Sequence, residues 1–143
     1  MLFRSDLKSI PFGEYIAELV HEIQASFGEE GARVTVEIEA KEIYFDVDNA
    51  VPLGLIINEL TTNAFKYAFD GKPRGKFNIY ITRSGGNYEL RISDNGKGIP
   101  EEIDIRKTRS LGLRLVRVLS DQLEGEYAFE NNGGMNFNLK FAA

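Results

Sequence analysis

Three polar side chains recur at helical spacing in the segment 58–69. Glu59, Asn63 and Lys66 are separated by four and three residues, so at about 100° per residue they share one stripe of a helix. A carboxylate, a neutral oxygen ligand and a cation suit a hydrated magnesium ion bound to phosphates, because magnesium keeps several waters and takes few protein ligands. The alternative interpretation is a solvated helix flank with an ordinary pairing of glutamate and lysine.

The second candidate is Asp94, which ends an alternating segment and enters a loop that holds Gly96 and Gly98. Asp94 has the parity of Leu90 and Ile92, so a regular strand would aim its carboxylate at the apolar side. A charge in that position needs a hydrogen-bond donor, which the exocyclic amine of adenine would supply. The glycines would let the backbone come close to a flat ring. The alternative is a plain turn, because Asp-Asn-Gly is a common turn sequence.

The third candidate is a helix start at Ser110, with Gly112 in its first turn. Serine is a good N-cap, and the free amides of a helix N-terminus can hold phosphate. The stretch 100–109 before it is polar and changes from acidic to basic residues, ending at Arg109. This stretch is either a lid whose basic end meets the phosphates or a solvated loop. In this order, the three elements describe a pocket for a nucleotide and its metal ion.

Composition limits the function classes. A chain of 143 residues predicts one domain with a sizeable core. Its 17 basic and 22 acidic residues give a net charge of −5, which argues against general nucleic-acid binding because that needs clustered cations. The absence of cysteine excludes disulfides, thiolate metal sites and cysteine nucleophiles. The N-terminus lacks the apolar stretch of a signal peptide and no apolar run is long enough for a membrane span, so we expect a soluble chain.

The periodicity around the candidates predicts the elements that must position them. Helical spacing predicts helices over 11–27, 51–69 and 111–123. The middle helix should bury one face, made of Leu53, Ile56, Ile57, Leu60, Ala64 and Ala68. Alternation of period two predicts strands over 32–39, 43–47, 76–83, 88–93, 126–130 and 135–141. Because helices and strands come in blocks, we predict an α+β fold, a two-layer α/β sandwich with helices on one face of a mixed, largely antiparallel sheet.

The segments 52–69 and 110–116, together with the loop 94–98, resemble a known family closely. The chain looks like the catalytic, ATP-binding domain of a sensor histidine kinase, in the GHKL superfamily shared with DNA gyrase, the large heat-shock chaperones and the MutL mismatch-repair proteins. It is most similar to the bacterial and archaeal branch with short ATP lids. The resemblance runs from about Glu14 to Phe141 and implies a Bergerat-type sandwich that binds ATP and Mg²⁺.

The resemblance also implies roles for individual residues. Asn63 would ligate Mg²⁺, and Asp94 would accept a hydrogen bond from the adenine amine. Glu59 matches the carboxylate that orients or deprotonates water in the ATPases of the superfamily; in a kinase whose nucleophile is an imidazole, it would be a catalytic residue that assists. The other positions expected to contact the nucleotide are Lys66, Tyr67, Gly96, Gly98, Ile99, Arg109, Leu111, Gly112 and Leu113.

Met135 departs from the family pattern. Near this position the family usually has a threonine or serine, whose hydroxyl joins a water network to the adenine and the aspartate. By strand parity Met135 faces inward, and a thioether is a poor substitute for that donor. We therefore expect looser adenine binding, by about 1 kcal/mol if one hydrogen bond is lost.

The family passes the γ-phosphoryl group to a histidine on a separate helical hairpin. We expect residues 1–12 to be the remnant of a linker from this upstream dimerisation and phosphoacceptor segment, and residues 13–143 to form the catalytic domain. The partners would be that segment and a response regulator, without contact to nucleic acid or membrane, in the cytoplasm. The only histidine of the chain, His21, is expected to be a surface residue without a role in transfer.

Two other functions stay open. A domain of this size also resembles the anti-sigma factor kinases, which phosphorylate a serine on a partner protein. The segments 54–56 and 111–114 are closer to the sensor kinases. The second alternative is a nucleotide-binding module without turnover, for which Met135 is the only hint in the sequence.

Overall fold

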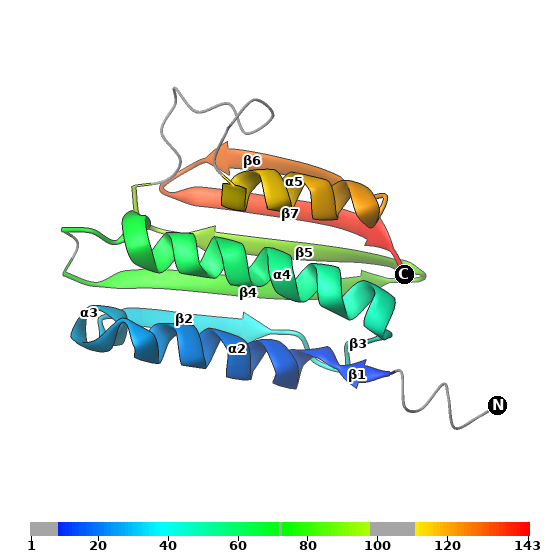
Figure 1. Cartoon of the computed structure of the whole chain (residues 1–143), viewed down its shortest axis with the longest axis horizontal. Helices are drawn as coiled ribbons and strands as arrows, with labels where there is room; N and C mark the ends of the chain where they lie inside the picture. Colours follow the sequence, from blue (N-terminus) through cyan, green and yellow to red (C-terminus); the bar gives the residue numbers. More distant parts are fainter. Residues whose placement is uncertain (1–8, 72, 98–110) are drawn as a thin grey trace.

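The computed structural model describes residues 9–71, 73–97 and 111–143, which form a layer of helices on a layer of strands (Figure 1). The helices are α2 (Phe12–Ser26), α3 (Gly28–Ala32), α4 (Val47–Asn63), the π-helical η1 (Ala64–Ala68) and α5 (Leu111–Gln122). The strands are β1 (Ile10–Pro11), β2 (Val34–Glu39), β3 (Tyr44–Phe45), β4 (Gly75–Ser84), β5 (Asn87–Asp94), β6 (Glu126–Asn131) and β7 (Met135–Ala142).

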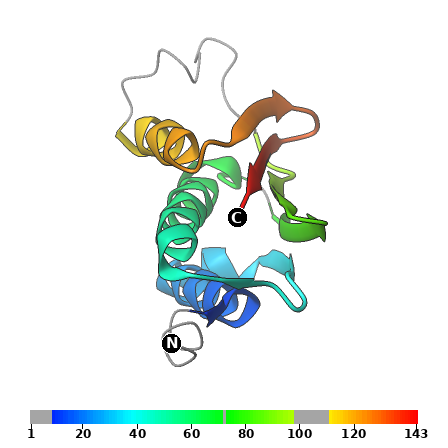
Figure 2. The same ribbon diagram turned by 90° about the vertical axis from the view of Figure 1, so that its right-hand side faces the viewer.

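The main sheet has five strands in the order β2-β4-β5-β7-β6. Strand β2 is parallel to β4, and the other neighbours are antiparallel. Figure 2 shows the helices gathered on one side of this sheet. The predicted α+β sandwich with a mixed, largely antiparallel sheet is therefore confirmed.

The face predicted for the middle helix is the face that packs on the sheet. From α4 and η1, Leu53, Ile56 and Ile57 are fully buried, and Leu60, Ala64 and Ala68 are at most 7% exposed. They meet the inward side chains of the central strands, of which the most buried are Phe77, Ile79, Leu90, Ile92, Phe137 and Leu139. The opposite face of the sheet carries polar side chains such as Asn78 and Ser93, whose Nδ2 and Oγ lie 3.4 Å apart.

Three predicted elements near the N-terminus have wrong boundaries. The first helix was expected from residue 11, but Pro11 has an extended backbone and belongs to β1. The strand predicted over 43–47 is only Tyr44–Phe45, and it pairs with β1 in a separate two-stranded sheet. The reason is the next helix: Asp46 caps α4 by accepting a hydrogen bond from the backbone N–H of Asn49 at 3.1 Å, so α4 begins at Val47 and not at residue 51.

A further helical turn was also missed. Gly28 has a φ of +59° and ends α2, which the sequence predicted. The chain then forms α3 before β2 begins at Val34, two residues later than predicted. The side chain of Gln24 holds this corner, because its Nε2 donates to the carbonyl oxygens of Gly31 and Val34 at 3.0 and 2.8 Å.

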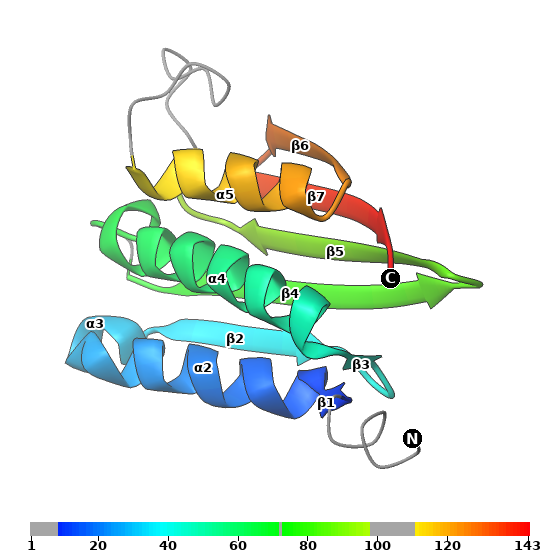
Figure 3. The same cartoon turned by 45° about the vertical axis from the view of Figure 1, so that its right-hand side comes forward.

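The elements that carry the candidate residues are neighbours in this fold. Helices α4 and α5 lie side by side on the sheet (Figure 3), and β5 is hydrogen-bonded to β7. The C-terminal ends of α4 and β5 and the N-terminal ends of α5 and β7 lie in one region of the molecule. None of the described helices is both long and apolar enough to cross a membrane.

Candidate functional site

The end of α4 and the start of α5 meet at Gly112. A Cβ atom placed on Gly112 would lie 2.5 Å from Oε2 of Glu59 and 3.6 Å from Nδ2 of Asn63. Both side chains are half-buried. A carboxylate and an amide from one helix thus flank the first turn of the next helix, where backbone N–H groups have no partner inside the helix. This is an arrangement that can hold a phosphate group and a cation together.

Asp94 lies at the end of β5 and is only 6% exposed, on the apolar side that strand parity predicts. Its Oδ1 accepts hydrogen bonds from two backbone N–H groups, that of Gly96 at 2.9 Å and that of Met135 at 3.3 Å. Hydrogen bonds to a charged group are the stronger ones and compensate the cost of its burial. The carboxylate is therefore held in one orientation by the main chain of its own loop and of β7.

The loop after Asp94 is fastened on two sides. Asn95 extends the ladder to β4: its N–H donates to the carbonyl of Lys76 at 3.2 Å, and its Oδ1 accepts from the N–H of Lys76 at 2.8 Å. Lys97 donates its N–H to the carbonyl of Ala68 at 2.9 Å. Gly96 lies so close to η1 that a Cβ atom on it would be 2.1 Å from the same carbonyl oxygen. The loop with Asp94 is thus bound directly to the end of η1.

The turn before β7 also approaches Asp94 closely. Gly134 has a φ of +130°, and a Cβ atom on it would lie 2.0 Å from the backbone oxygen of Asp94. Met135 follows it and is buried, as its parity predicted. The sequence predicted 131–134 only as a turn, without its close approach to Asp94. It also did not predict that Asn95 fastens the loop after β5. The signal for Asn95 was its side chain, which commonly bonds nearby backbone in turns.

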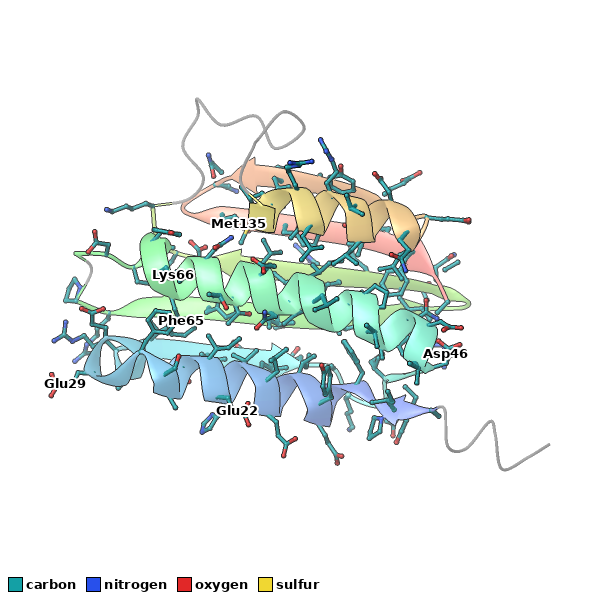
Figure 4. The ribbon with its side chains drawn as sticks, in the orientation of Figure 1. Glu22, Glu29, Asp46, Phe65, Lys66 and Met135 are labelled. Atoms are coloured by element: carbon teal, nitrogen blue, oxygen red, sulfur yellow. The ribbon has the colours of Figure 1, made fainter. Side chains whose placement is uncertain are left out.

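Lys66 and Tyr67 lie in η1, where the helix widens from α to π geometry. A π-turn holds more residues than an α-turn, so Lys66 is carried around the axis relative to Asn63. It lines a hollow of about 350 Å³ with Arg33 and Asp70. Figure 4 shows Lys66 at this end of the helix. Tyr67 is 65% exposed. The structure thus brings Glu59, Asn63 and Gly112 together, but it does not extend their stripe to Lys66.

Some expected contacts lie outside the described residues. These are Gly98, Ile99, Arg109, the rest of the stretch 100–109 and the expected N-cap Ser110. The side chain of Leu111 is not described either. Leu113, in the first turn of α5, is half-buried and packs against the core.

The available oxygen ligands fit a magnesium ion better than a metal whose ligands all come from the protein. Within residues 9–71, 73–97 and 111–143, no three histidine, cysteine, aspartate or glutamate side chains are grouped to hold a metal. Magnesium binds through one or two protein oxygens together with phosphates and water. Asn63 and Glu59 offer such oxygens beside the start of α5, so the residues present fit this ion.

Residues 48–143 match the family described as histidine kinase-, DNA gyrase B-, and HSP90-like ATPase. The chain belongs to this ATPase family. The match contains α4, the loop after β5, α5 and β7, which are the elements that form the site. Together with the histidine kinase relatives and the solved structure described next, this match confirms the resemblance to the catalytic domain of sensor histidine kinases.

Two relatives of this ATPase domain are histidine kinases by name. The blue-light-activated histidine kinase 2 of Erythrobacter litoralis is 30% identical over 127 residues, which are 88% of this chain and 36% of the relative. The sensor histidine kinase PdtaS of Mycolicibacterium smegmatis is 33% identical over 99 residues, 66% of this chain and 20% of the relative. The chain therefore spans about a third and a fifth of the lengths of these relatives.

The fold agrees with a solved structure of the same kind. The histidine kinase domain of the blue-light-activated kinase EL346 of E. litoralis superposes with a TM-score of 0.84 at 27% identity, over 93% of this chain and 61% of that chain. A shorter match is the anti-sigma F factor of Halalkalibacterium halodurans, 30% identical over 82 residues, 57% of this chain and 56% of the relative. The two histidine kinase relatives described above match a larger share of this chain than this anti-sigma factor does.

Proposed function

We propose that this domain binds Mg·ATP and supplies the γ-phosphoryl group to a histidine on a dimerisation domain. The observation that carries the proposal is the meeting of Glu59 and Asn63 with the first turn of α5 at Gly112, beside the strand end that holds Asp94. The sensor kinase relatives support the histidine acceptor. In this proposal residues 1–12 are part of the linker to the dimerisation domain, residues 13–143 are the catalytic domain, and a response regulator in the cytoplasm receives the phosphoryl group.

Each residue has a task that its position permits. The carboxylate of Asp94 accepts a hydrogen bond from the adenine amine. The backbone N–H groups of Gly96 and Met135 hold this carboxylate in place. The free amides at the start of α5 bind phosphate oxygens, and Asn63 offers its side-chain oxygen to the metal. Magnesium, when bound, neutralises phosphate charge. Glu59 lies next to Gly112 and orients the acceptor imidazole or takes its proton.

Phosphorylation of a serine on a partner is the second candidate, supported by the anti-sigma F relative. The two candidates form different bonds, and the stability of the product distinguishes them. Phosphohistidine is hydrolysed in acid and survives alkali, whereas phosphoserine survives acid and is lost in alkali. A nucleotide-binding module without turnover would form neither bond.

The protein that contains this domain should therefore be incubated with ATP labelled at the γ-phosphate and then treated with acid or alkali. We expect label on the protein itself that acid removes and alkali leaves. The label should be lost in Asn63→Asp and kept in His21→Gln, since His21 is exposed on α2. Acid-stable label on a second protein would contradict the histidine acceptor, and ATP binding without any label would favour the binding module.

A further inference from the structure

The hollow of about 350 Å³ that Lys66 lines lies between the start of β2 and the end of η1. We call it the η1 hollow. Its walls include the rings of Phe65 and Phe69, which are 7% and 9% exposed. Figure 4 shows Phe65 and Lys66 together at this end of the helical layer. The volume suits a small organic molecule, because pockets for such ligands begin at roughly 300 Å³.

The walls of the η1 hollow are fixed by contacts within the fold. The N–H of Gly75 donates to the carbonyl of Arg33 at 3.1 Å, which joins the starts of β4 and β2. Nε2 of Gln24 donates to the carbonyl of Val34 at 2.8 Å. Gly75 also approaches Phe69 so closely that a Cβ atom on it would lie 2.4 Å from the ring. The hollow is therefore preformed, which reduces the ordering that a ligand must impose.

Two cations and two carboxylates stand at the rim of the hollow. Arg33, Lys66, Glu30 and Asp70 line it, and all four are exposed. Asp70 is already paired, because its Oδ2 lies 3.6 Å from Nζ of Lys97. Among the described residues, no carboxylate forms an ion pair with the guanidinium of Arg33 or the ammonium of Lys66. The unpaired charges at the rim are thus two positive and one negative.

The aromatic walls and the unpaired cations together define a class of ligand. A guanidinium binds a carboxylate through two parallel hydrogen bonds, and an ammonium adds a point charge. The rings of Phe65 and Phe69 stand edge to face, with their centroids 5.8 Å apart, and rings in such positions pack well on a flat apolar group. An anion without an apolar body would use the cations alone.

We propose that the η1 hollow binds a small organic anion with a flat apolar body, such as an aromatic carboxylate. Arg33 and Lys66 bind the carboxylate group, and the apolar body lies against Phe65 and Phe69. In the described parts of the chain, neither the loop after β5 nor α5 contributes to the walls of the hollow. The domain therefore binds this anion at a site separate from the nucleotide site.

Titration of the whole chain with naphthoate tests the class of ligand, beside the uncharged naphthamide and inorganic phosphate. Naphthoate should bind at least about tenfold more tightly than either, because only naphthoate offers a charged acceptor together with a flat apolar body. In nuclear magnetic resonance spectra, naphthoate should shift the backbone amide signals of Arg33, Val34 and Gly75. Equal affinities for naphthoate and naphthamide would overturn the proposal, and so would shifts confined to the nucleotide site around Asp94.

Substitutions at the rim test the site itself. Because the sequence also predicted Lys66 at the nucleotide, Arg33 is the cation that tests the hollow alone. Arg33→Gln should weaken naphthoate binding about tenfold through the loss of charged hydrogen bonds, whereas Glu30→Gln should strengthen it about twofold by removing a nearby negative charge. Arg74→Gln is the matched control and should have no effect, because Arg74 is exposed on the same turn but does not line the hollow.

All three substituted side chains are exposed, so the melting temperature should stay that of the unsubstituted chain. Equal naphthoate affinity in Arg33→Gln and Arg74→Gln would overturn the proposal. Weaker binding in Glu30→Gln would also contradict it, because it would show that the ligand needs the carboxylate of the rim.

Discussion

Asp94 combines burial with charge. It is 6% exposed, and two backbone N–H groups donate to its Oδ1. Removing a donor from a buried carboxylate costs more than a hydrogen bond usually contributes, because the desolvated charge is then poorly compensated. One of the donors is the main chain of Met135, so a substitution of the Met135 side chain keeps this bond. The effect of that side chain on adenine can therefore be measured separately.

Met135→Thr should bind an ATP analogue about fivefold more tightly, because a hydroxyl restores about 1 kcal/mol of hydrogen bonding toward the adenine. The domain should also lose roughly 1–3 kcal/mol in the free energy of unfolding, since a buried side chain becomes smaller. Isothermal titration measures the first effect and urea unfolding the second. Affinity that is unchanged or weaker would count against a missing donor at this position.

At the scale of elements, two glycines set how closely helices approach the site, and they differ in what they contact. Gly112 of α5 faces the end of a flexible side chain, the carboxylate of Glu59. Gly96 faces main chain, the carbonyl of Ala68 at the end of η1. A side chain can rotate away from a new methyl group, whereas a backbone carbonyl inside a hydrogen-bonded segment cannot. Gly112 therefore affects the chemistry and Gly96 the packing.

The matched pair Gly112→Ala and Gly96→Ala tests this difference. Gly112→Ala should keep the melting temperature close to that of the unsubstituted domain but lower phosphotransfer about 10- to 100-fold, because Glu59 is displaced. Gly96→Ala should lower the free energy of unfolding by roughly 1–3 kcal/mol through overpacking. Calorimetry measures the effect of each substitution on stability, and phosphotransfer rates measure its effect on the chemistry. Normal phosphotransfer in Gly112→Ala would show that the displaced Glu59 is not needed.

The periodicity of the sequence predicted the buried face of α4 and the inward side of Asp94, because both depend on local geometry alone. It did not predict η1 (Ala64–Ala68), and local periodicity cannot show that Ala68 contacts Lys97 in a loop that is distant in the chain. The pairing of β1 with β3 was missed for the same reason. Asn95 looked like a turn residue, and only the structure shows its two bonds to Lys76.

In the molecule as a whole, the five-stranded sheet buries its apolar side under the helices and leaves the other side polar. Phe137 lies at the centre of this arrangement, 1% exposed, with its ring centroid 4.8 Å from that of Phe129. The site is assembled at the ends of elements that this core holds together. Its geometry therefore depends on the core.

Phe137→Ala should lower the free energy of unfolding by about 3–5 kcal/mol, because it leaves a cavity in the sheet–helix interface. This is a large part of the roughly 5–15 kcal/mol that a domain has. Thr82→Ala, at an exposed position of β4, is the control and should stay within about 0.5 kcal/mol. Chemical unfolding of the three proteins measures both values. A loss below about 1 kcal/mol in Phe137→Ala would contradict the central position of this ring.

The central claim is that the buried carboxylate of Asp94 binds the base of a nucleotide. Titration calorimetry of the domain with Mg²⁺ and a non-hydrolysable ATP analogue tests it, with Asp94→Asn beside Asp70→Asn. Asp70 is the matched control because its ion pair with Lys97, at 3.6 Å, is on the surface. We predict one analogue bound per chain, an affinity about 10- to 100-fold lower in Asp94→Asn, and little change in Asp70→Asn. Full affinity in a folded Asp94→Asn variant would contradict the claim.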